Sequence, residues 1–174
     1  KQEHDFEILK DPRLETSEED YQAQFDLWMN IRDQLSETNR LLNQLRRIRR
    51  EIHVILERPN LQKIQVPDEL SSFKDNAEKV IQKLKVLENE LVQTKNETPS
   101  DRLRFPVMLR DHIEGLISVV AVAEAAPPQQ AHEVFQHLKG LLAEKTSSMQ
   151  QLLSVDLLTL KELAQKANIQ FFEE

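Results

Sequence analysis

The sequence predicts an all-α fold, an up-and-down antiparallel four-helix bundle with long first and last helices. Three observations support this class. Only two glycines occur in 174 residues, whereas β-rich and α/β folds of this size need more turn glycines. Apolar residues recur at steps of three and four over long stretches, which is the spacing of one helix face. Prolines and polar clusters divide the chain into four such stretches with short connections, which favour antiparallel neighbours.

The first 15 residues (1–15) are predicted to form an extended lead-in, a linker from a preceding domain. The segment "FEILKDPRL" is typical of a short strand followed by a turn at Asp11-Pro12. The chain does not open on methionine or on a signal peptide. We therefore expect it to be part of a longer protein, with one helical domain of ordinary size over residues 16–174.

The first helix is predicted from about Ser17 to Arg58. Thr16 would serve as its N-cap, and Glu19, three residues later, would complete a capping box. A helix of this length reaches roughly 60 Å. Its expected core stripe comprises Trp28, Ile31, Leu35, Thr38, Leu42, Leu45, Ile52 and Ile55.

The second helix is predicted from about Pro67 to Lys95, and the third from about Pro106 to Ala126. The second has the most regular heptad of the chain, formed by Leu70, Phe73, Ala77, Val80, Leu84, Leu87 and Leu91. The third carries a stripe of Leu109, Ile113, Leu116, Val120 and Ala123. Its segment "LISVVAV" makes it apolar nearly all round, so we expect it to be the most buried helix. A strand is the alternative on propensity, but no second strand lies nearby to pair with it.

The fourth helix is predicted to follow the turn at Pro127-Pro128 and to run from about Gln129 to Asn168. Its apolar register slips near residues 153–157, which predicts a stutter or a bend. The expected stripe comprises Phe135, Leu138, Leu142, Met149, Leu152, Leu153, Leu157, Leu160 and Ala164.

An arginine cluster lies in the second half of the first helix. It consists of Arg46, Arg47, Arg49 and Arg50. Because Ile48 faces the core, the cluster takes the outward arc of the helix. The favoured interpretation is a solvated face of ion pairs, and a patch that binds an acidic protein partner is the alternative. The net charge of -7 and the absence of aromatic residues nearby argue against nucleic acid.

The partners of the arginine cluster depend on where the chain reverses. If the second helix folds back from a loop near residue 63, Asp75 and Glu78 come level with the cluster. Exposed ion pairs contribute little, so alanine at Arg46 and Arg50 should change stability by less than about 1 kcal/mol. An anion-binding face would instead give a steep dependence of binding on salt.

No catalytic, cofactor or metal site is predicted. The segment "AHEVFQH" is one residue longer than the zinc-protease pattern, so His132 and His137 lie about 140° apart on a helix and cannot share a metal. His53 and His112 are isolated, and cysteine is absent. The longest apolar run, Leu116–Ala126, is far shorter than the roughly 20 residues that span a bilayer, so no membrane insertion is expected.

Two stretches contain a recognisable set of packing and cap positions. The first holds Phe6, Asp11-Pro12-Arg13, Tyr21–Leu27 and Ile31–Thr38. The second holds Phe105-Pro106, Leu109, Pro128 and Glu133–Phe135. Together they resemble the helical tail that follows the β-propeller in bacterial sortilin-like, BNR-repeat "glycosyl hydrolase" proteins. The resemblance covers nearly the whole chain but is weaker across residues 59–98.

This resemblance implies a non-catalytic C-terminal module of an exported protein, periplasmic or secreted. The module would act as a spacer or as a docking domain for the β-propeller of the same protein or for another protein. Two alternatives stay open. The apolar stripes could pair between chains and form a homodimer, or carboxylates of the module could complete a glycoside hydrolase site together with the propeller. The second alternative requires buried, convergent carboxylates.

Overall fold

The fold is an all-α helical bundle, as predicted. A computed structural model describes residues 3–7, 9–58, 61 and 67–171 of the chain. The long helices are α1 (Glu18–Leu56), α2 (Pro67–Leu91), α3 (Leu109–Ala121), α4 (Gln129–Gln151) and α5 (Leu158–Lys166). A short 3-10 helix, η2 (Pro99–Leu103), lies between α2 and α3, and a π-helical turn, η3 (Leu152–Leu157), joins α4 to α5.

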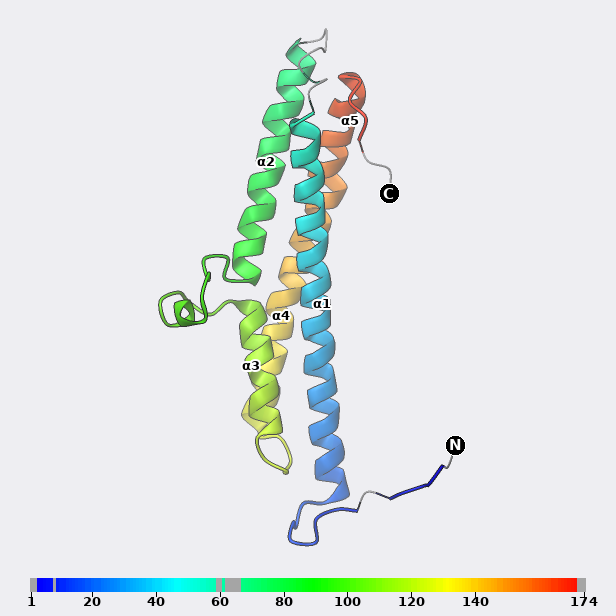
Figure 1. Ribbon diagram of the computed structural model, residues 1–174, viewed down its shortest axis with the longest axis vertical. Coiled ribbons are helices and arrows are strands. Elements are labelled where there is room, and N and C mark those ends of the chain that lie inside the picture. Colours follow the sequence, from blue (N-terminus) through cyan, green and yellow to red (C-terminus); the bar gives the residue numbers. More distant parts are fainter. Residues whose placement is uncertain (1–2, 8, 59–60, 62–66, 172–174) are drawn as a thin grey trace.

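The helices form three antiparallel rods rather than four. α1 makes the first rod, α2 and α3 follow one another in the second, and α4, η3 and α5 make the third (Figure 1). Both α2 and α3 pack against α1, while α2 also packs against α5 and α3 against α4. The expected up-down-up-down order is therefore wrong, although the first and last helices are long as predicted.

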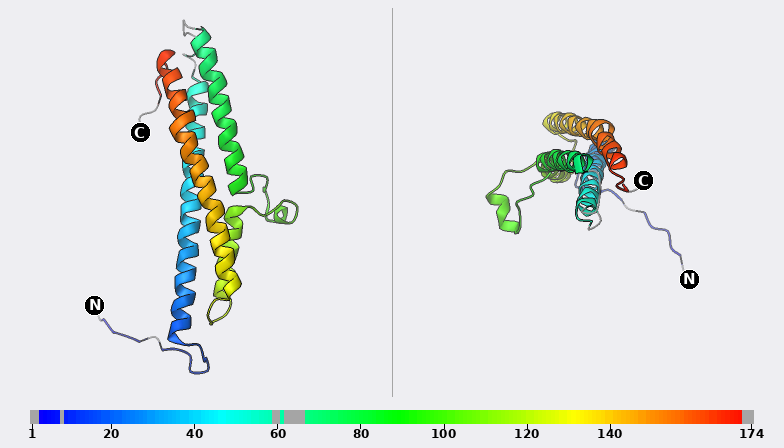
Figure 2. Two further views of the ribbon diagram at one scale, coloured as in Figure 1. Left: turned by 180° about the vertical axis from the view of Figure 1, so that it is seen from behind. Right: turned by 90° about the horizontal axis from the view of Figure 1, so that it is seen from above.

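The segment between α2 and α3 explains this difference. Residues 92–108 leave the bundle, project sideways with η2 at their tip and return at the same level (Figure 2). The chain therefore does not reverse there, and α3 continues in the direction of α2. Apolar periodicity marks where a helix ends, but it does not say whether the next helix turns back.

The lead-in and the start of α1 differ from the prediction in two ways: the lead-in has no strand in its described part, and the N-cap of α1 lies one residue later. The described part of the lead-in contains no strand, but Asp11 does begin a turn, since its carbonyl accepts the Leu14 N–H at 3.1 Å. The N-cap of α1 is Ser17, whose Oγ accepts the Asp20 N–H at 3.1 Å, and Asp20 in turn accepts the Ser17 N–H at 3.3 Å. Thr16 instead donates its hydroxyl to the carbonyl of Glu124.

The core follows most of the predicted stripes, although Leu35, Leu70, Leu153 and Leu157 are only partly buried, and there are two larger exceptions. The stripe of α2 is confirmed from Phe73 to Leu91. In α1, however, Trp28 is 42% exposed and the neighbouring Leu27 is buried in its place. The buried residues of α1 are Leu27, Ile31, Gln34, Thr38, Leu41, Leu42, Leu45, Ile48, Ile52 and Ile55.

The second exception is α3, which is not buried on all sides. Its stripe from Leu109 to Val120 is buried, but Ala123 is exposed, Val119 is half exposed and Val122, just after the helix, is 83% exposed. The reason is that α3 packs mainly against α1 and α4 and has little contact with α2. The remainder of its surface faces solvent.

The last rod bears out the predicted register slip and then ends at a defined motif. The π-helical turn lies at Leu152–Leu157, where a stutter was expected. After α5, Asn168 adopts φ 52°. The Asn168 N–H donates to the Gln165 carbonyl at 3.1 Å, and the Ile169 N–H to the Ala164 carbonyl at 2.8 Å. This pattern is a Schellman motif, and it buries Ile169 as its apolar contact.

Candidate functional site: a groove beside the arginine cluster

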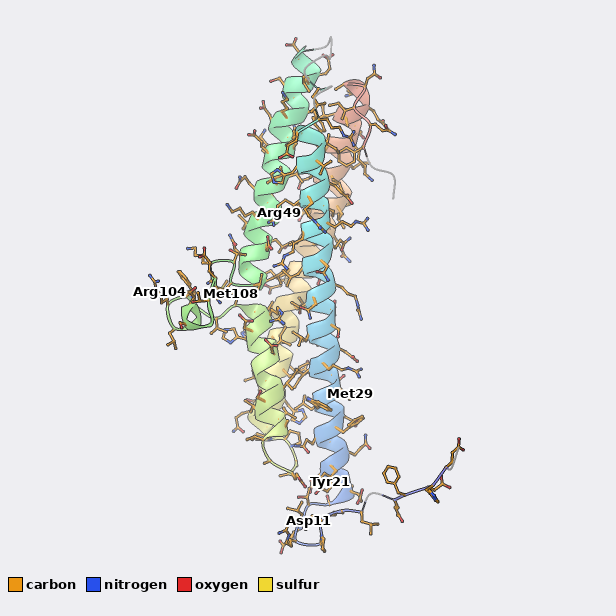
Figure 3. The ribbon with its side chains drawn as sticks, in the orientation of Figure 1. Asp11, Tyr21, Met29, Arg49, Arg104 and Met108 are labelled. Atoms are coloured by element: carbon orange, nitrogen blue, oxygen red, sulfur yellow. The ribbon has the colours of Figure 1, made fainter. Side chains whose placement is uncertain are left out.

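Two members of the arginine cluster converge on one buried carboxylate of α2. Arg46 donates from Nε to Glu88 Oε1 at 2.6 Å, and Arg49 donates from Nη1 to Glu88 Oε2. The Glu88 side chain is only 5% exposed, whereas those of Arg46 and Arg49 are 44% and 27% exposed. Figure 3 shows Arg49 on the side of α1 that faces α2. The arginines are thus a salt-bridged face, as predicted, but part of that face is an interhelical contact.

The predicted partners, Asp75 and Glu78, are not the residues that pair with the cluster. Both are exposed and lie nearer the start of α2. Arg46 pairs with Glu88, whereas a symmetric reversal at residue 63 would place position 80 opposite Arg46. The first turns of α2 consequently extend beyond the end of α1 (Figure 1).

The charge state of Glu88 results from two opposing effects. Burial raises the pKa of its carboxyl, while hydrogen bonds and positive charge from Arg46 and Arg49 lower it. The arginines prevail, and the pKa lies below the usual range of a glutamate. Glu88 is therefore ionised at neutral pH and orients both guanidinium groups.

The other two arginines lie outside this contact. Arg47 pairs with Glu51 on the next turn of α1, at 3.2 Å between Nε and Oε1, and stays mostly exposed. Arg50 is exposed on the outer arc of the helix. For Arg50→Ala we still expect the free energy of unfolding to fall by less than about 1 kcal/mol. For Arg46 we expect more, because its loss leaves a buried carboxylate with one partner.

A groove opens beside the Glu88 contact, between α1, α2 and the segment after α2. Its volume is about 660 Å³, within the range of ligand sites in proteins. The charged residues on its wall are Arg46, Arg49, Lys85 and Glu88, and its polar residues include His53, Gln82, Asn89, Gln93, Thr94 and Asn96. We call it the arginine groove.

The end of the arginine groove is held by local hydrogen bonds. Thr94 Oγ1 donates to Asn89 Oδ1 at 2.7 Å, and Gln93 Nε2 donates to the Pro106 carbonyl at 3.2 Å. Asn96 Oδ1 is buried and accepts no hydrogen bond from any described residue. Buried acceptors normally have a donor, and this oxygen has none among the described residues.

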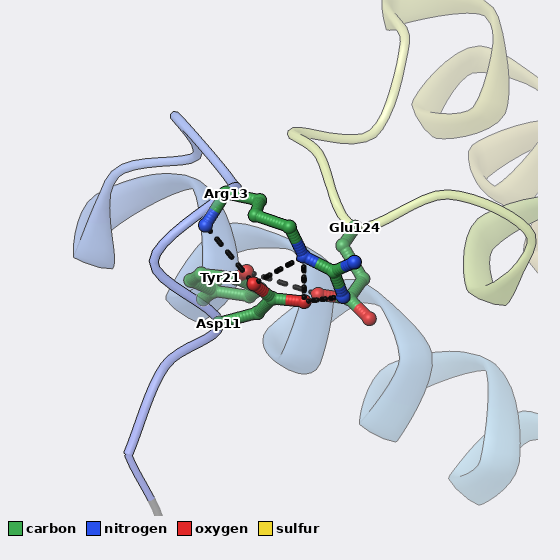
Figure 4. Close-up of polar contacts among 4 residues, drawn as sticks. All are labelled: Asp11, Arg13, Tyr21 and Glu124. Carbon is green, nitrogen blue, oxygen red and sulfur yellow. Dashed lines mark hydrogen bonds and ion pairs between the residues drawn. The ribbon is translucent and has the colours of Figure 1, made fainter.

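A second polar arrangement joins the start of α1 to the end of α3. Tyr21 donates its hydroxyl to Glu124 Oε2 at 3.1 Å (Figure 4). Gln24 Nε2 donates to the carbonyls of Val120 and Ala123, at 2.7 and 2.5 Å. Loss of solvent contact, and then the carboxylate of Glu124, raise the pKa of Tyr21. The two hydrogen bonds from Gln24 satisfy carbonyls that the end of α3 would otherwise leave unpaired.

The same end of the bundle exposes several large apolar side chains. We call this surface the apolar end, and it comprises Phe25, Trp28, Val119, Val122 and Val134. Phe25 and Trp28 line a hollow of about 310 Å³ against Val120 and Ala121. Val119 and Val134 line another of about 310 Å³ between α3 and α4. Clustered exposed apolar groups mark interaction surfaces more often than isolated ones do.

The remaining candidate residues do not come together. His132 is half-buried and His137 exposed on α4, while His53 and His112 lie on other helices. Over the described ranges, no group of three or more histidine, aspartate or glutamate side chains could hold a metal ion. None of the helices in these ranges has a stretch both long and apolar enough to cross a bilayer.

Comparisons with known proteins add no relatives: no family model, curated protein or solved structure matches the chain. The site therefore has to be understood from its own geometry. Sequence reasoning found the arginine cluster but missed Glu88 and the apolar end. Glu88 directly follows the core position Leu87 on α2, but the sequence does not indicate how far α2 extends past the end of α1.

Proposed function

We propose that this chain is a non-catalytic accessory module of a larger protein. It is a helical rod that acts as a spacer and docks on a protein surface through its apolar end. The observation that carries the proposal is the apolar end, where Phe25, Trp28, Val119, Val122 and Val134 are exposed. It lies at one end of a bundle whose first helix has 39 residues, a length of about 58 Å. The lead-in enters at that same end (Figure 1).

The resemblance to helical tails of β-propeller proteins supports placing this module next to a β-propeller domain. In that setting the apolar end docks on the β-propeller of the same protein, or on another protein, and the rod projects away from it. The exported location and the bacterial origin belong to the same proposal. Phe6 and Leu9, exposed in the lead-in, would be covered by the neighbouring domain.

Homodimerisation is the second candidate, and the same apolar end favours it. The heptad of α2 is buried within the chain from Phe73 to Leu91, so the exposed apolar end is the surface that would form the dimer contact. Light scattering behind a sizing column, at several concentrations, separates the candidates. A stable mass of one chain supports the docking module, and a stable mass of two chains makes the dimer the leading function.

Trp28 provides a specific probe for docking because it is the single tryptophan of the chain. We would label the chain with ¹⁵N, titrate it with the unlabelled propeller domain and follow the one indole N–H resonance. Docking should shift or broaden that resonance. Phe25→Ser should weaken the effect, whereas Val54→Ser should not, since Val54 is equally exposed but lies near the far end of α1.

The proposal fails if the resonance is unchanged at saturating propeller. It also fails if Val54→Ser and Phe25→Ser weaken binding equally, because the contact would then not depend on the apolar end. Far-UV circular dichroism of both variants checks that each retains the helical fold.

A further inference from the structure

The arginine groove has more hydrogen-bond donors than Glu88 uses. Each guanidinium carries five N–H donors, and Glu88 occupies Nε of Arg46 and Nη1 of Arg49. Both arginine side chains keep part of their surface in the groove. Because Glu88 is buried and fixes the two planes, their remaining donors are already oriented before any ligand arrives.

Charge in the groove is also unbalanced. Lys85 lies one turn before Glu88 on α2, is exposed to the groove and forms no ion pair with a described residue. The wall thus carries three cations, Arg46, Arg49 and Lys85, against the single carboxylate of Glu88. This excess is local, since the whole chain has a net charge of -7. Such a wall attracts an anionic group.

The placement of the cations narrows the kind of anion. They are spread over two helices, with Arg46 and Arg49 on α1 and Lys85 on α2. A phosphate or sulfate ion is compact, whereas a peptide with acidic side chains carries carboxylates spaced along a chain. The groove follows α2 from Ile81 to Asn89, about 12 Å of helix. That length suits about four residues of extended chain.

We propose that the arginine groove binds a short acidic peptide segment of a partner protein. Side-chain carboxylates of the segment contact Arg46, Arg49 and Lys85. Glu88 is a positioning residue that holds the arginines ready. This site is independent of the apolar end, so it stands or falls separately from the proposed docking function.

The test uses a fluorescein-labelled tetraglutamate peptide, followed by fluorescence anisotropy as the intact chain is added. Labelled tetraglutamine and tetralysine serve as ligand controls. Lys85→Gln removes a groove cation, and Arg47→Gln is its matched control, because Arg47 is a cation on α1 outside the groove wall. Both side chains are exposed, and circular dichroism verifies both folds.

We expect tetraglutamate to bind with a Kd below about 1 mM at low salt, and the controls not to bind. Salt at about 0.5 M should weaken binding. Lys85→Gln should lower affinity about threefold, and Arg47→Gln should leave it unchanged. The proposal is overturned if tetraglutamate does not bind or if both variants lose affinity equally. It is also overturned if inorganic phosphate displaces the peptide at equal concentration, which would indicate a simple anion site.

Discussion

Replacing Glu88 by glutamine removes the charge on which Arg46 and Arg49 converge while keeping the shape of the side chain. A hydrogen bond to a charged group contributes about 1.5–3 kcal/mol, and two such bonds are present. Breaking a fully buried ion pair costs about 3–5 kcal/mol. Both arginines can recover water, since they are 44% and 27% exposed. We therefore expect Glu88→Gln to lower the free energy of unfolding by about 2 kcal/mol.

Urea unfolding at pH 7, followed by circular dichroism at 222 nm, measures this free energy. Glu90→Gln is the matched control on the same helix. Glu90 pairs with Lys145 at 2.9 Å but is 46% exposed, so its replacement should cost less than about 1 kcal/mol. Equal effects of the two substitutions would mean that the burial of Glu88 has no energetic consequence.

The effect of Glu88 should also depend on pH, with a defined sign. Its folded-state pKa is below 4.5, the ordinary value of a glutamate. The unfolded chain therefore binds the proton more readily than the folded chain. The contribution of Glu88 is fully present above pH 4.5 and is lost as the pH falls through the folded-state pKa. The stability gap between the native chain and Glu88→Gln should narrow on acidification, and a constant gap would refute the assigned ion pairs.

Three further predictions concern the fold, and urea unfolding checks each of them. Leu84→Ala should cost about 2–5 kcal/mol because Leu84 is fully buried, whereas Val86→Ala on the exposed face should change little. Ser17→Ala should lower the free energy of unfolding by about 1 kcal/mol because it removes the N-cap of α1. Thr16→Ala leaves that N-cap in place and should not cause this loss. Asn168→Gly should be neutral or stabilising, while Asn168→Ala should cost about 1 kcal/mol, since φ is 52° there; equal stability of the two would contradict the Schellman motif.

The helical class and the α2 stripe could be predicted because local periodicity determines them. Where two neighbouring residues both fit the apolar spacing or the capping pattern, the sequence could not predict which of them takes the position. Leu27 and Trp28 stand four and three residues before Ile31, so either fits the stripe, and packing places Leu27 inside. Thr16 and Ser17 are each followed by an acidic residue three positions later, and the structure uses Ser17.

The interhelical contacts were harder to predict because they depend on where the chain reverses. The arginine cluster is visible in the sequence, but its partner depends on how α2 is placed along α1. A shift of the reversal by a few residues moves the facing position on α2 by about twice as many. Asp75 and Glu78 were therefore expected where Glu88 lies. The apolar end could not be predicted either, because the burial of α3 depends on the number of rods around it.

The π-helical turn of the last rod is related to the break between α2 and α3. α4 packs against α3, and α5 packs against α2, so one continuous rod changes partner along its length. η3 lies at that change and contacts α2, with Asp156 paired to Lys83 at 2.7 Å. The buried positions Leu152, Leu160 and Ala164 advance by eight and then four residues, which turns the stripe by about 120° on an α-helix. The wider π turn absorbs this rotation. The projecting segment 92–108 thus separates α2 from α3 in the second rod. The π turn allows the third rod to pack against both α2 and α3 without such an interruption.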